Sequence, residues 1–205
     1  SRNIAKADKT MKNGEWAKKQ LKGNELGGKT LGLIGTGNIG KYTANLAKCF
    51  GMKIIGYDPF ISKEDMKKDG IEKIEKIDDL VSKSDFISLH IPHIKATHHI
   101  INKDMISKMK KTAFLINCAR GGTVDENALY DALKEGLIAG AALDVYESEP
   151  PKESPLSKLD NVIMTPHLGA STKEGQIKAG TVCAEQIIKV LNGKEPDYCV
   201  NKKFL

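Results

Sequence analysis

The sequence has few of the features that mark secreted, metal-binding or membrane-spanning proteins. Its 4 cysteines are scattered and form no CxxC pair, which argues against a zinc site or a disulfide framework. Nothing resembles a signal peptide, and no apolar run approaches the roughly 18 residues of a membrane span. Aromatic residues make up only 5% of the chain, and none interleave with basic residues as in nucleic-acid-binding faces. We therefore expect a reduced, cytoplasmic protein that binds neither nucleic acid nor membrane.

The positive charge is concentrated at the beginning of the chain. The formal net charge is +6, and residues 1–29 carry 8 Lys and Arg against 3 Asp and Glu. The remainder is nearly balanced, so we interpret the lysines as a solvated exterior. With 205 residues and 40% hydrophobic residues, the chain can form one substantial core or at most two small domains.

Short apolar runs alternate with amphipathic segments along most of the chain. TLGLI at 30–34 ends in a glycine loop, a helical pattern follows at 38–50, and KIIGY at 53–57 is a second strand. This alternation predicts an α/β fold with a doubly wound parallel sheet (Rossmann), covered on both faces. Further strands are expected at 86–91, 113–117, 139–145 and 161–165, and helices at 62–69, 78–83, 103–110, 125–136 and 171–192.

The motif GTGNIG follows the first strand and opens the first helix of this pattern. Gly35 permits a tight turn, Gly37 lets the backbone approach a pyrophosphate, and Gly40 allows close packing of helix on strand. Asp58 ends the second strand, where a carboxylate accepts the ribose hydroxyls and repels a 2′-phosphate. The motif therefore predicts NAD rather than NADP, the alternative being a turn whose glycines serve packing alone.

Three polar residues, Arg120, Glu149 and His167, each follow an apolar strand. The carboxyl ends of parallel strands share one edge of a sheet, so these side chains are candidates to converge there. Histidine can move a proton near neutral pH, a carboxylate can orient the ring, and an arginine can bind a substrate carboxylate bidentately. Each of the three also fits an ordinary solvated loop residue.

The segments GTGNIG, NCARGG, GAALDVYESEPP and TPHLGAST occur in this order. Together they resemble the NAD-binding half of the D-isomer-specific 2-hydroxyacid dehydrogenases, over nearly the whole chain. The resemblance implies that Arg120 binds substrate, Glu149 orients the catalytic histidine, and His167 is the acid/base. The cofactor contacts that it implies, together with the glycine motif, are Gly35, Gly37, Asn38, Ile39, Gly40, Asp58, Ile91, Cys118, Ala119, Arg120, Asp144, His167, Gly169 and Ala170.

The same resemblance implies NAD-dependent oxidation of a small anionic 2-hydroxy acid by a homodimer that associates through this domain. D-3-phosphoglycerate is the substrate that the motifs favour. Reduction of glyoxylate or hydroxypyruvate, or D-lactate oxidation, remain alternatives because those family members share the Arg/Glu/His set. A non-enzymatic NAD-sensing module is an alternative from a different functional class.

The two ends of the chain lie outside the alternating pattern. Residues 1–27 resemble an inter-domain helix and hinge, 28–193 the NAD-binding Rossmann domain, and 194–205 a tail crossing toward a substrate domain. The resemblance implies that this substrate domain is absent from the chain. We expect a chain of this extent to bind NADH and to turn over poorly by itself.

Four histidines, His90, His93, His98 and His99, lie close together in the sequence. They lack the neighbouring cysteines or carboxylates of a known zinc pattern. We therefore predict no metal site.

Overall fold

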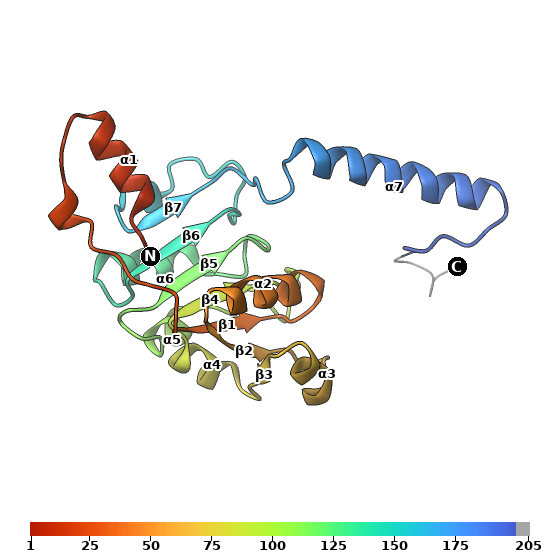
Figure 1. Cartoon of the computed structure of the whole chain (residues 1–205), viewed down its shortest axis with the longest axis horizontal. Coiled ribbons are helices and arrows are strands. Elements are labelled where there is room, and N and C mark those ends of the chain that lie inside the picture. The colour runs from red at the N-terminus through yellow and green to blue at the C-terminus, as the bar shows by residue number, and fades with distance from the viewer. Residues whose placement is uncertain (200–205) are drawn as a thin grey trace. The chain divides into compact units, whose positions relative to one another are not determined.

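The computed structural model describes residues 1–199, so part of the predicted tail at 194–205 lies outside the described residues. Seven parallel strands form one sheet in the order β3-β2-β1-β4-β5-β6-β7 (Figure 1). This confirms the predicted doubly wound parallel sheet. The strands are β1 Thr30–Ile34, β2 Lys53–Tyr57, β3 Glu72–Lys73, β4 Phe86–Leu89, β5 Phe114–Asn117, β6 Gly140–Leu143 and β7 Val162–Met164.

The helices fall between the strands as predicted, and most are shorter at one or both ends. Figure 1 shows α2 on one side of the sheet and α5 and α6 on the other. The short strand β3 was not predicted, because two residues at the edge of a sheet carry no periodic signal. The helices are α1 Ile4–Lys12, α2 Asn38–Cys49, α3 Lys63–Lys68, α4 Ile77–Lys83, α5 Lys103–Ser107, α6 Glu126–Lys134 and α7 Lys173–Leu191, with 3₁₀ turns η1 Lys18–Gln20 and η2 Pro155–Lys158.

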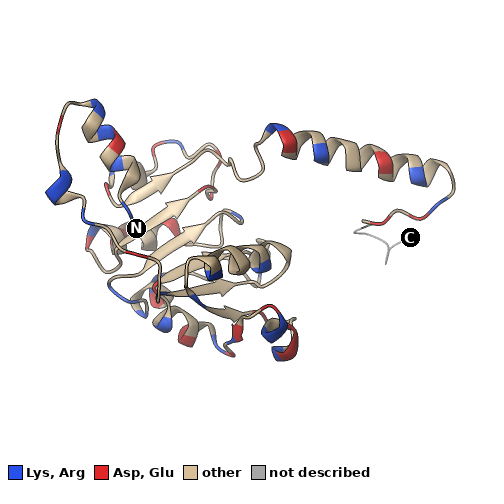
Figure 2. Cartoon of the chain, in the orientation of Figure 1, with Lys and Arg blue, Asp and Glu red and all other residues tan. Residues whose placement is uncertain are grey.

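Side chains alternate between the two faces of the sheet and form a core on each. On one face, Leu31 and Leu33 of β1 belong to the same cluster as Ala44 of α2. On the other face, Ile87 of β4 belongs to a cluster with Leu129 of α6. The central strands β1, β4, β5 and β6 contain no charged residue, as Figure 2 shows. Strands covered on both faces have this composition because neither face meets water.

The structure divides into two compact units, which are described separately. The first runs from Ser1 to Pro166 and contains the sheet, and the second begins at His167 and contains α7. Within the second unit no residue of α7 is buried, and the Thr172 hydroxyl caps the helix by accepting from the Gly175 amide. The domain boundaries predicted at 27/28 and 193/194 stay predictions. Within residues 1–199, no helix is long and apolar enough to cross a membrane.

The order of the strands determines where a ligand can bind to the first unit. From β1 the chain moves outward through β2 and β3, then returns to the other side of β1 and continues through β4 to β7. In such sheets the crevice opens at the carboxyl ends of the two strands where the direction changes, here β1 and β4. The glycine loop follows one of these strands, and His90 follows the other.

Candidate active site at the carboxyl edge of the sheet

The predicted site residues of the first unit follow the carboxyl ends of neighbouring strands. The glycine loop 35–40 follows β1, Asp58 follows β2, and Ile91 lies just beyond β4. Cys118–Arg120 follow β5, and Asp144 follows β6 directly. Because all these strands are parallel, the five segments lie along one edge of one sheet. The strand order therefore puts these segments where the prediction needs them, and the predicted convergence of Arg120, Glu149 and His167 stays a prediction.

Two glycines of the loop are required for steric reasons within the fold, and the third faces open space. Gly35 has a φ of +91°, and a Cβ there would lie 2.6 Å from the carbonyl oxygen of His90. A Cβ on Gly40 would lie 2.4 Å from the carbonyl oxygen of Gly35, which fits the predicted close packing of helix on strand. A Cβ on Gly37 would meet no described atom within 4 Å. Gly37 therefore faces open space, and its lack of a side chain leaves that space free for a ligand.

Asp58 is bound to the glycine loop from the neighbouring strand. Its carboxylate accepts hydrogen bonds from the Thr36 amide at 2.9 Å and the Thr36 hydroxyl at 3.4 Å. Its other oxygen accepts from the Phe60 amide at 3.0 Å. These bonds hold the carboxylate beside the first turn of the loop, although 22 residues separate Asp58 from Thr36.

These residues fit a dinucleotide. The open space at Gly37, the N-cap of α2, is where a pyrophosphate would meet the amides of the first helical turn, which have no intrahelical partners. Asn38 and Ile39 form that first turn, and the Ile39 side chain is 70% exposed. Asp58 lies beside this position and offers a carboxylate to the ribose hydroxyls.

His90 and Ile91 form the wall of the loop on the side of β4. A Cβ on Gly35 would lie 2.8 Å from a methyl group of Ile91, so the Ile91 side chain is in contact with the loop. The predicted contact of Ile91 with the cofactor stays a prediction. The His90 ring forms a hydrogen bond of 3.0 Å with the Ser88 hydroxyl through Nε2. Burial lowers the pKa of His90 to about 4, so the ring is neutral at physiological pH.

The loop after β5, which carries Arg120, is shaped by the buried side chain of Asn117. Asn117 donates to the Arg120 carbonyl at 3.0 Å and to the Thr123 hydroxyl at 3.2 Å, and accepts from the Ala119 amide at 3.0 Å. The Thr123 hydroxyl donates to the same Arg120 carbonyl at 2.8 Å. Two side chains thus fold the backbone around Arg120 into one turn.

The turn also packs directly against the loop that follows β6. A Cβ on Gly121 would lie only 1.7 Å from the Tyr146 carbonyl oxygen, so no other residue fits this position without a backbone shift. The Arg120 side chain is exposed and donates through Nη1 to the Ala119 carbonyl at 2.6 Å. Most of its donors therefore face solvent at the carboxyl edge, and they are available to an anion.

A hydrogen-bond network holds the segment after β6. The Thr165 hydroxyl donates to the buried Asp144 carboxylate at 2.5 Å. The Tyr146 hydroxyl donates to the Leu143 carbonyl at 3.1 Å and the Thr165 carbonyl at 2.8 Å. The Tyr146 amide in turn donates to the Glu149 carboxylate at 3.1 Å. Glu149 is therefore held close to the backbone beyond β6, two residues after Glu147.

His167 is the first residue of the second unit, and Gly169 and Ala170 follow it there. Its backbone has a φ of +54°, in the left-handed region that residues other than glycine seldom adopt. Within this unit the Ser171 amide donates to the Leu168 carbonyl at 2.9 Å, which closes a turn immediately after the histidine. The expectation that His167 meets Glu149 and Arg120 stays a prediction.

Four residues that shape the site were missed by the sequence reasoning: Thr36, Asn117, Tyr146 and Thr165. Thr36, Tyr146 and Thr165 form hydrogen bonds to residues that are distant in the sequence, whereas Asn117 bonds to a residue only a few positions away. Only Asn117 had a usable signal, because an asparagine that ends a strand before a Gly-Gly pair is typical of a side-chain-stabilised turn.

The neighbouring histidines form a stack of their own. His93 Nε2 and His98 Nδ1 share a hydrogen bond of 3.0 Å, and the rings of His98 and His99 stack with centroids 3.9 Å apart. His99 Nε2 lies 3.0 Å from the Glu147 carboxylate. His90 is separate, since it pairs with Ser88. In residues 1–199, no group of three or more histidine, cysteine or acidic side chains could hold a metal ion.

Comparison with known proteins gives the same family as the motifs. The model of the D-isomer specific 2-hydroxyacid dehydrogenase NAD binding domain matches residues 1–169. The chain is 56% identical to D-3-phosphoglycerate dehydrogenase of Methanocaldococcus jannaschii over 201 residues, 98% of this chain and 38% of that protein. It is 50% identical to hydroxypyruvate reductase of Thermotoga maritima over 194 residues, 93% of this chain and 62% of that protein.

A solved structure confirms the fold. The crystal structure of a glyoxylate reductase from Paecilomyes thermophila is similar with a TM-score of 0.91 and 33% identity, over 98% of this chain and 61% of that one. The chain thus spans less than two thirds of the length of each of these three relatives. With the glycine loop and Asp58 in place at the crevice, the chain belongs to the D-isomer specific 2-hydroxyacid dehydrogenases and contains their NAD binding domain.

Proposed function

We propose that the protein containing this chain oxidises D-3-phosphoglycerate to 3-phosphohydroxypyruvate with NAD. The observation that carries the proposal is the Arg120 turn, which presents an exposed guanidinium at the same sheet edge as the glycine loop. The similarity to the phosphoglycerate dehydrogenase of M. jannaschii, over nearly the whole chain, supports the choice of substrate. The similarity to a hydroxypyruvate reductase makes an unphosphorylated hydroxy acid the main competing substrate.

In this proposal Arg120 binds the substrate carboxylate. A guanidinium offers two parallel N–H donors that match the two oxygens of a carboxylate, which fixes the orientation of the substrate as well as its position. The turn built by Asn117 and Thr123 would hold the arginine backbone rigid while its side chain reaches the ligand.

His167 takes the proton of the substrate hydroxyl, and Glu149 orients the imidazole. Bound NAD supplies the hydride acceptor, held by the loop 35–40 and Asp58. A carboxylate that bonds to the imidazole fixes the direction of the ring, and the histidine that takes the proton returns it in the reverse reaction. The Glu149 carboxylate accepts from the Tyr146 amide, which supports its role as a fixed group.

The substrate is tested with the protein as its gene encodes it, by following NADH absorbance. 3-Phosphohydroxypyruvate, hydroxypyruvate, glyoxylate and pyruvate are offered in turn. We expect the highest kcat/KM with the phosphorylated keto acid. A preference for an unphosphorylated keto acid would keep the roles of the residues and reject the substrate.

The variant His167→Ala separates an enzyme from a non-enzymatic NAD-sensing module. Loss of the acid/base should lower kcat by roughly 10²–10⁴-fold. The midpoint of urea denaturation should match that of the wild type and serves as the control for folding. No turnover by the wild-type protein with any of the four keto acids would favour the sensing module.

We also propose that the protein forms a homodimer through the NAD-binding domain, as the family resemblance implies. Light scattering on the protein at several concentrations tests this. A monomeric mass at all concentrations would contradict it.

A further inference from the structure

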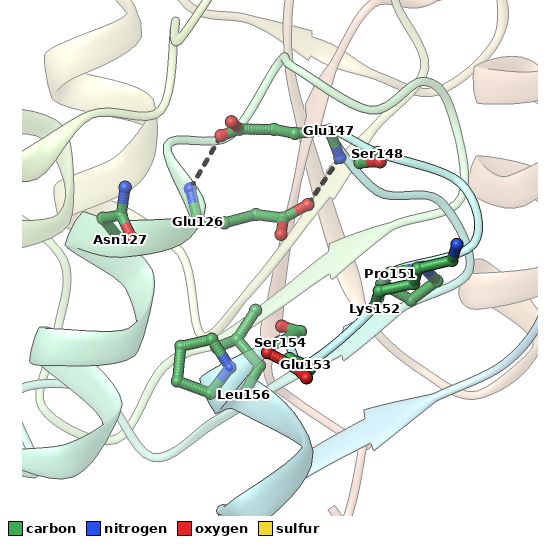
Figure 3. A pocket seen from close by; sticks show the side chains of 10 residues that line it. Glu126, Asn127, Glu147, Ser148, Pro151, Lys152, Glu153, Ser154 and Leu156 are labelled. Atoms are coloured by element: carbon green, nitrogen blue, oxygen red, sulfur yellow. Dashed lines mark hydrogen bonds between the residues drawn. The ribbon is translucent and has the colours of Figure 1, made fainter.

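A pocket apart from the glycine loop lies in the first unit, between the start of α6 and the segment that leads into η2 (Figure 3). Its volume is about 250 Å³. None of the residues that line it has a role in the proposed reaction. They are Glu126, Asn127, Glu147, Ser148, Pro151, Lys152, Glu153, Ser154, Pro155 and Leu156.

The hydroxyl of Ser154 is buried in the wall of this pocket without a partner. Ser154 is 9% exposed, and its Oγ makes no hydrogen bond to any described residue. A serine at the N-cap of a helix usually accepts from a backbone amide, but Ser154 makes no such bond to η2, whose first residue is Pro155. Figure 3 shows its side chain among the residues that surround the pocket, facing Glu126. An unpartnered buried hydroxyl costs free energy, so a ligand that bonds to it is favoured.

Two glutamates fix the opposite wall by exchanging hydrogen bonds (Figure 3). The Glu147 amide donates to Glu126 Oε1 at 2.6 Å, and the Glu126 amide donates to Glu147 Oε1 at 3.1 Å. Glu147 Oε1 also lies 3.0 Å from His99 Nε2. Within the described chain, no group donates to the second oxygen of Glu126. That oxygen is positioned by a rigid backbone and is available to a donor in the pocket.

The electrostatics of the pocket favour a cation. Three carboxylates, Glu126, Glu147 and Glu153, line it against one lysine, Lys152. Burial raises the pKa of the Glu126 carboxyl, and the Glu147 carboxylate acts in the same direction, although the Glu147 amide and His99 oppose them. A cation next to Glu126 would stabilise the charged carboxylate against both the cost of burial and the repulsion by Glu147.

The size and the walls favour an organic cation over a metal ion. A volume of about 250 Å³ far exceeds the space of one ion, and no group of side chains in residues 1–199 has an arrangement that could hold a metal. Pro151 and Pro155 add apolar surface. A primary ammonium has three N–H donors, and a short carbon chain can lie against such walls.

We propose that this pocket binds a small aliphatic amine. The ammonium group donates to the free oxygen of Glu126 and to the hydroxyl of Ser154, and the carbon chain contacts the two prolines. Glu153, on the same wall as Ser154, accepts a second ammonium where the ligand is a diamine. This site is independent of the proposed dehydrogenase reaction and of the residues assigned to it.

The test is calorimetric titration of the protein with 1,4-diaminobutane and with butylamine. We expect saturable binding of both, and tighter binding of the diamine. Tetramethylammonium carries the same charge without N–H donors and should bind at least tenfold more weakly. Magnesium chloride at equal ionic strength controls for screening of the carboxylates.

Two substitutions that keep the fold locate the ligand. Glu126→Gln keeps an acceptor for the Glu147 amide and removes the charge, and Ser154→Ala removes only the unpartnered hydroxyl. Each should weaken amine binding by roughly tenfold or more, as expected for a hydrogen bond to a charged group. Glu135→Gln, at the C-cap of α6, and Ser82→Ala, in α4, are the matched controls. Both positions are exposed and lie outside the pocket, so these variants should bind as the wild type does.

Several results would overturn the proposal. They are no saturable binding of either amine, equal binding by Glu126→Gln and the wild type, or binding of magnesium in preference to the amines. A crystal structure in 1,4-diaminobutane that shows only water between Ser154 and Glu126 would also overturn it. Loss of NADH oxidation has no bearing on these readouts, so this proposal and the proposed function fail separately.

Discussion

Two loops at the same edge of the sheet reach a defined shape by opposite means. The loop after β1 is shaped by missing side chains, because a Cβ at Gly35 or Gly40 would collide with backbone oxygens. The loop after β5 is shaped by side chains that are present, because Asn117 and Thr123 hold the Arg120 carbonyl. In the second loop Gly121 and Gly122 are required for steric reasons, as Gly35 and Gly40 are in the first. A Cβ on Gly122, whose φ is +74°, would lie 2.7 Å from the His93 ring.

The difference follows from what each loop has to present. The loop after β1 exposes backbone amides to a ligand, and any side chain at Gly37 would fill the space that the ligand needs. The loop after β5 exposes one long side chain, and buried side-chain hydrogen bonds hold its backbone in place. A site formed by backbone amides can therefore be recognised in the sequence from the spacing of its glycines. A site formed by a side chain depends on hydrogen-bond partners that no sequence pattern identifies.

The largest loss of stability is expected at Gly121, where the second loop, like the first, has no room for a side chain. Gly121→Ala places a Cβ 1.7 Å from the Tyr146 carbonyl oxygen, and both partners are backbone. We expect a loss of at least about 3 kcal/mol in the free energy of unfolding, measured by urea denaturation. Gly180→Ala is the matched control, since its Cβ meets nothing within 4 Å and alanine favours the helix α7. Equal stability of the two variants would mean that the second loop is not sterically fixed.

The stability of the protein should depend on pH through His90, which follows β4 and forms a wall of the loop after β1. Burial lowers the pKa of His90 from 6.5 to about 4, so the unfolded chain binds a proton more readily than the folded one. The contribution of His90 to the free energy of unfolding is therefore fully present above pH 6.5. It falls by about 3 kcal/mol as the pH drops to 4. His90→Gln should remove this dependence of the free energy of unfolding on pH, measured by urea denaturation between pH 7 and pH 4.

The control for this pH dependence is Ser88→Ala, which removes the hydrogen-bond partner of the ring and leaves the ring buried. Because burial is the cause of the lowered pKa, the slope should persist in this variant. A slope that disappears in Ser88→Ala would show that the hydrogen bond, and not burial, determines the pKa of His90.

The loop after β5 should be weakened by loss of a side chain. Asn117→Ala removes three hydrogen bonds and leaves the Ala119 amide without its acceptor. We expect about 2 kcal/mol of destabilisation and a raised KM for the keto acid, because the Arg120 backbone is no longer held. Asn45→Ala, at an exposed position of α2, should change stability by less than about 0.5 kcal/mol. An unchanged KM in Asn117→Ala would separate the turn from substrate binding.

The smallest effect on stability is expected at Gly37, where only ligand binding should suffer. Gly37→Ala adds a methyl group in open space at a φ of −67°, so the fold should be as stable as the wild type. NADH affinity should fall about tenfold, close to 1.4 kcal/mol, because the methyl group occupies the approach of the pyrophosphate. Unchanged affinity by fluorescence titration would place the cofactor elsewhere.

Much of the fold followed from local pattern. The strands from β1 to β7 and the helices between them were predicted within a few residues, apart from β3, because fully buried strands and amphipathic helices have clear periodicities. Gly35, Gly37, Gly40 and Asp58 were predicted as one site because their spacing depends on a strand, a turn and a helix that are adjacent in the chain. The roles of Thr36, Tyr146 and Thr165 were missed because their hydrogen bonds to distant residues leave no periodic pattern in the sequence.

The sequence by itself determined the alternation of strands and helices, the glycine loop, and the residue types at the strand ends, since these depend on neighbours along the chain. Only the tertiary structure decided which residues hold those segments in place. Thr36 bonded to Asp58, and Thr165 to Asp144, are pairs 22 and 21 residues apart that meet because neighbouring parallel strands end at one edge. The pocket of Ser154 and Glu126 likewise exists only once η2 and α6 are packed in the same unit.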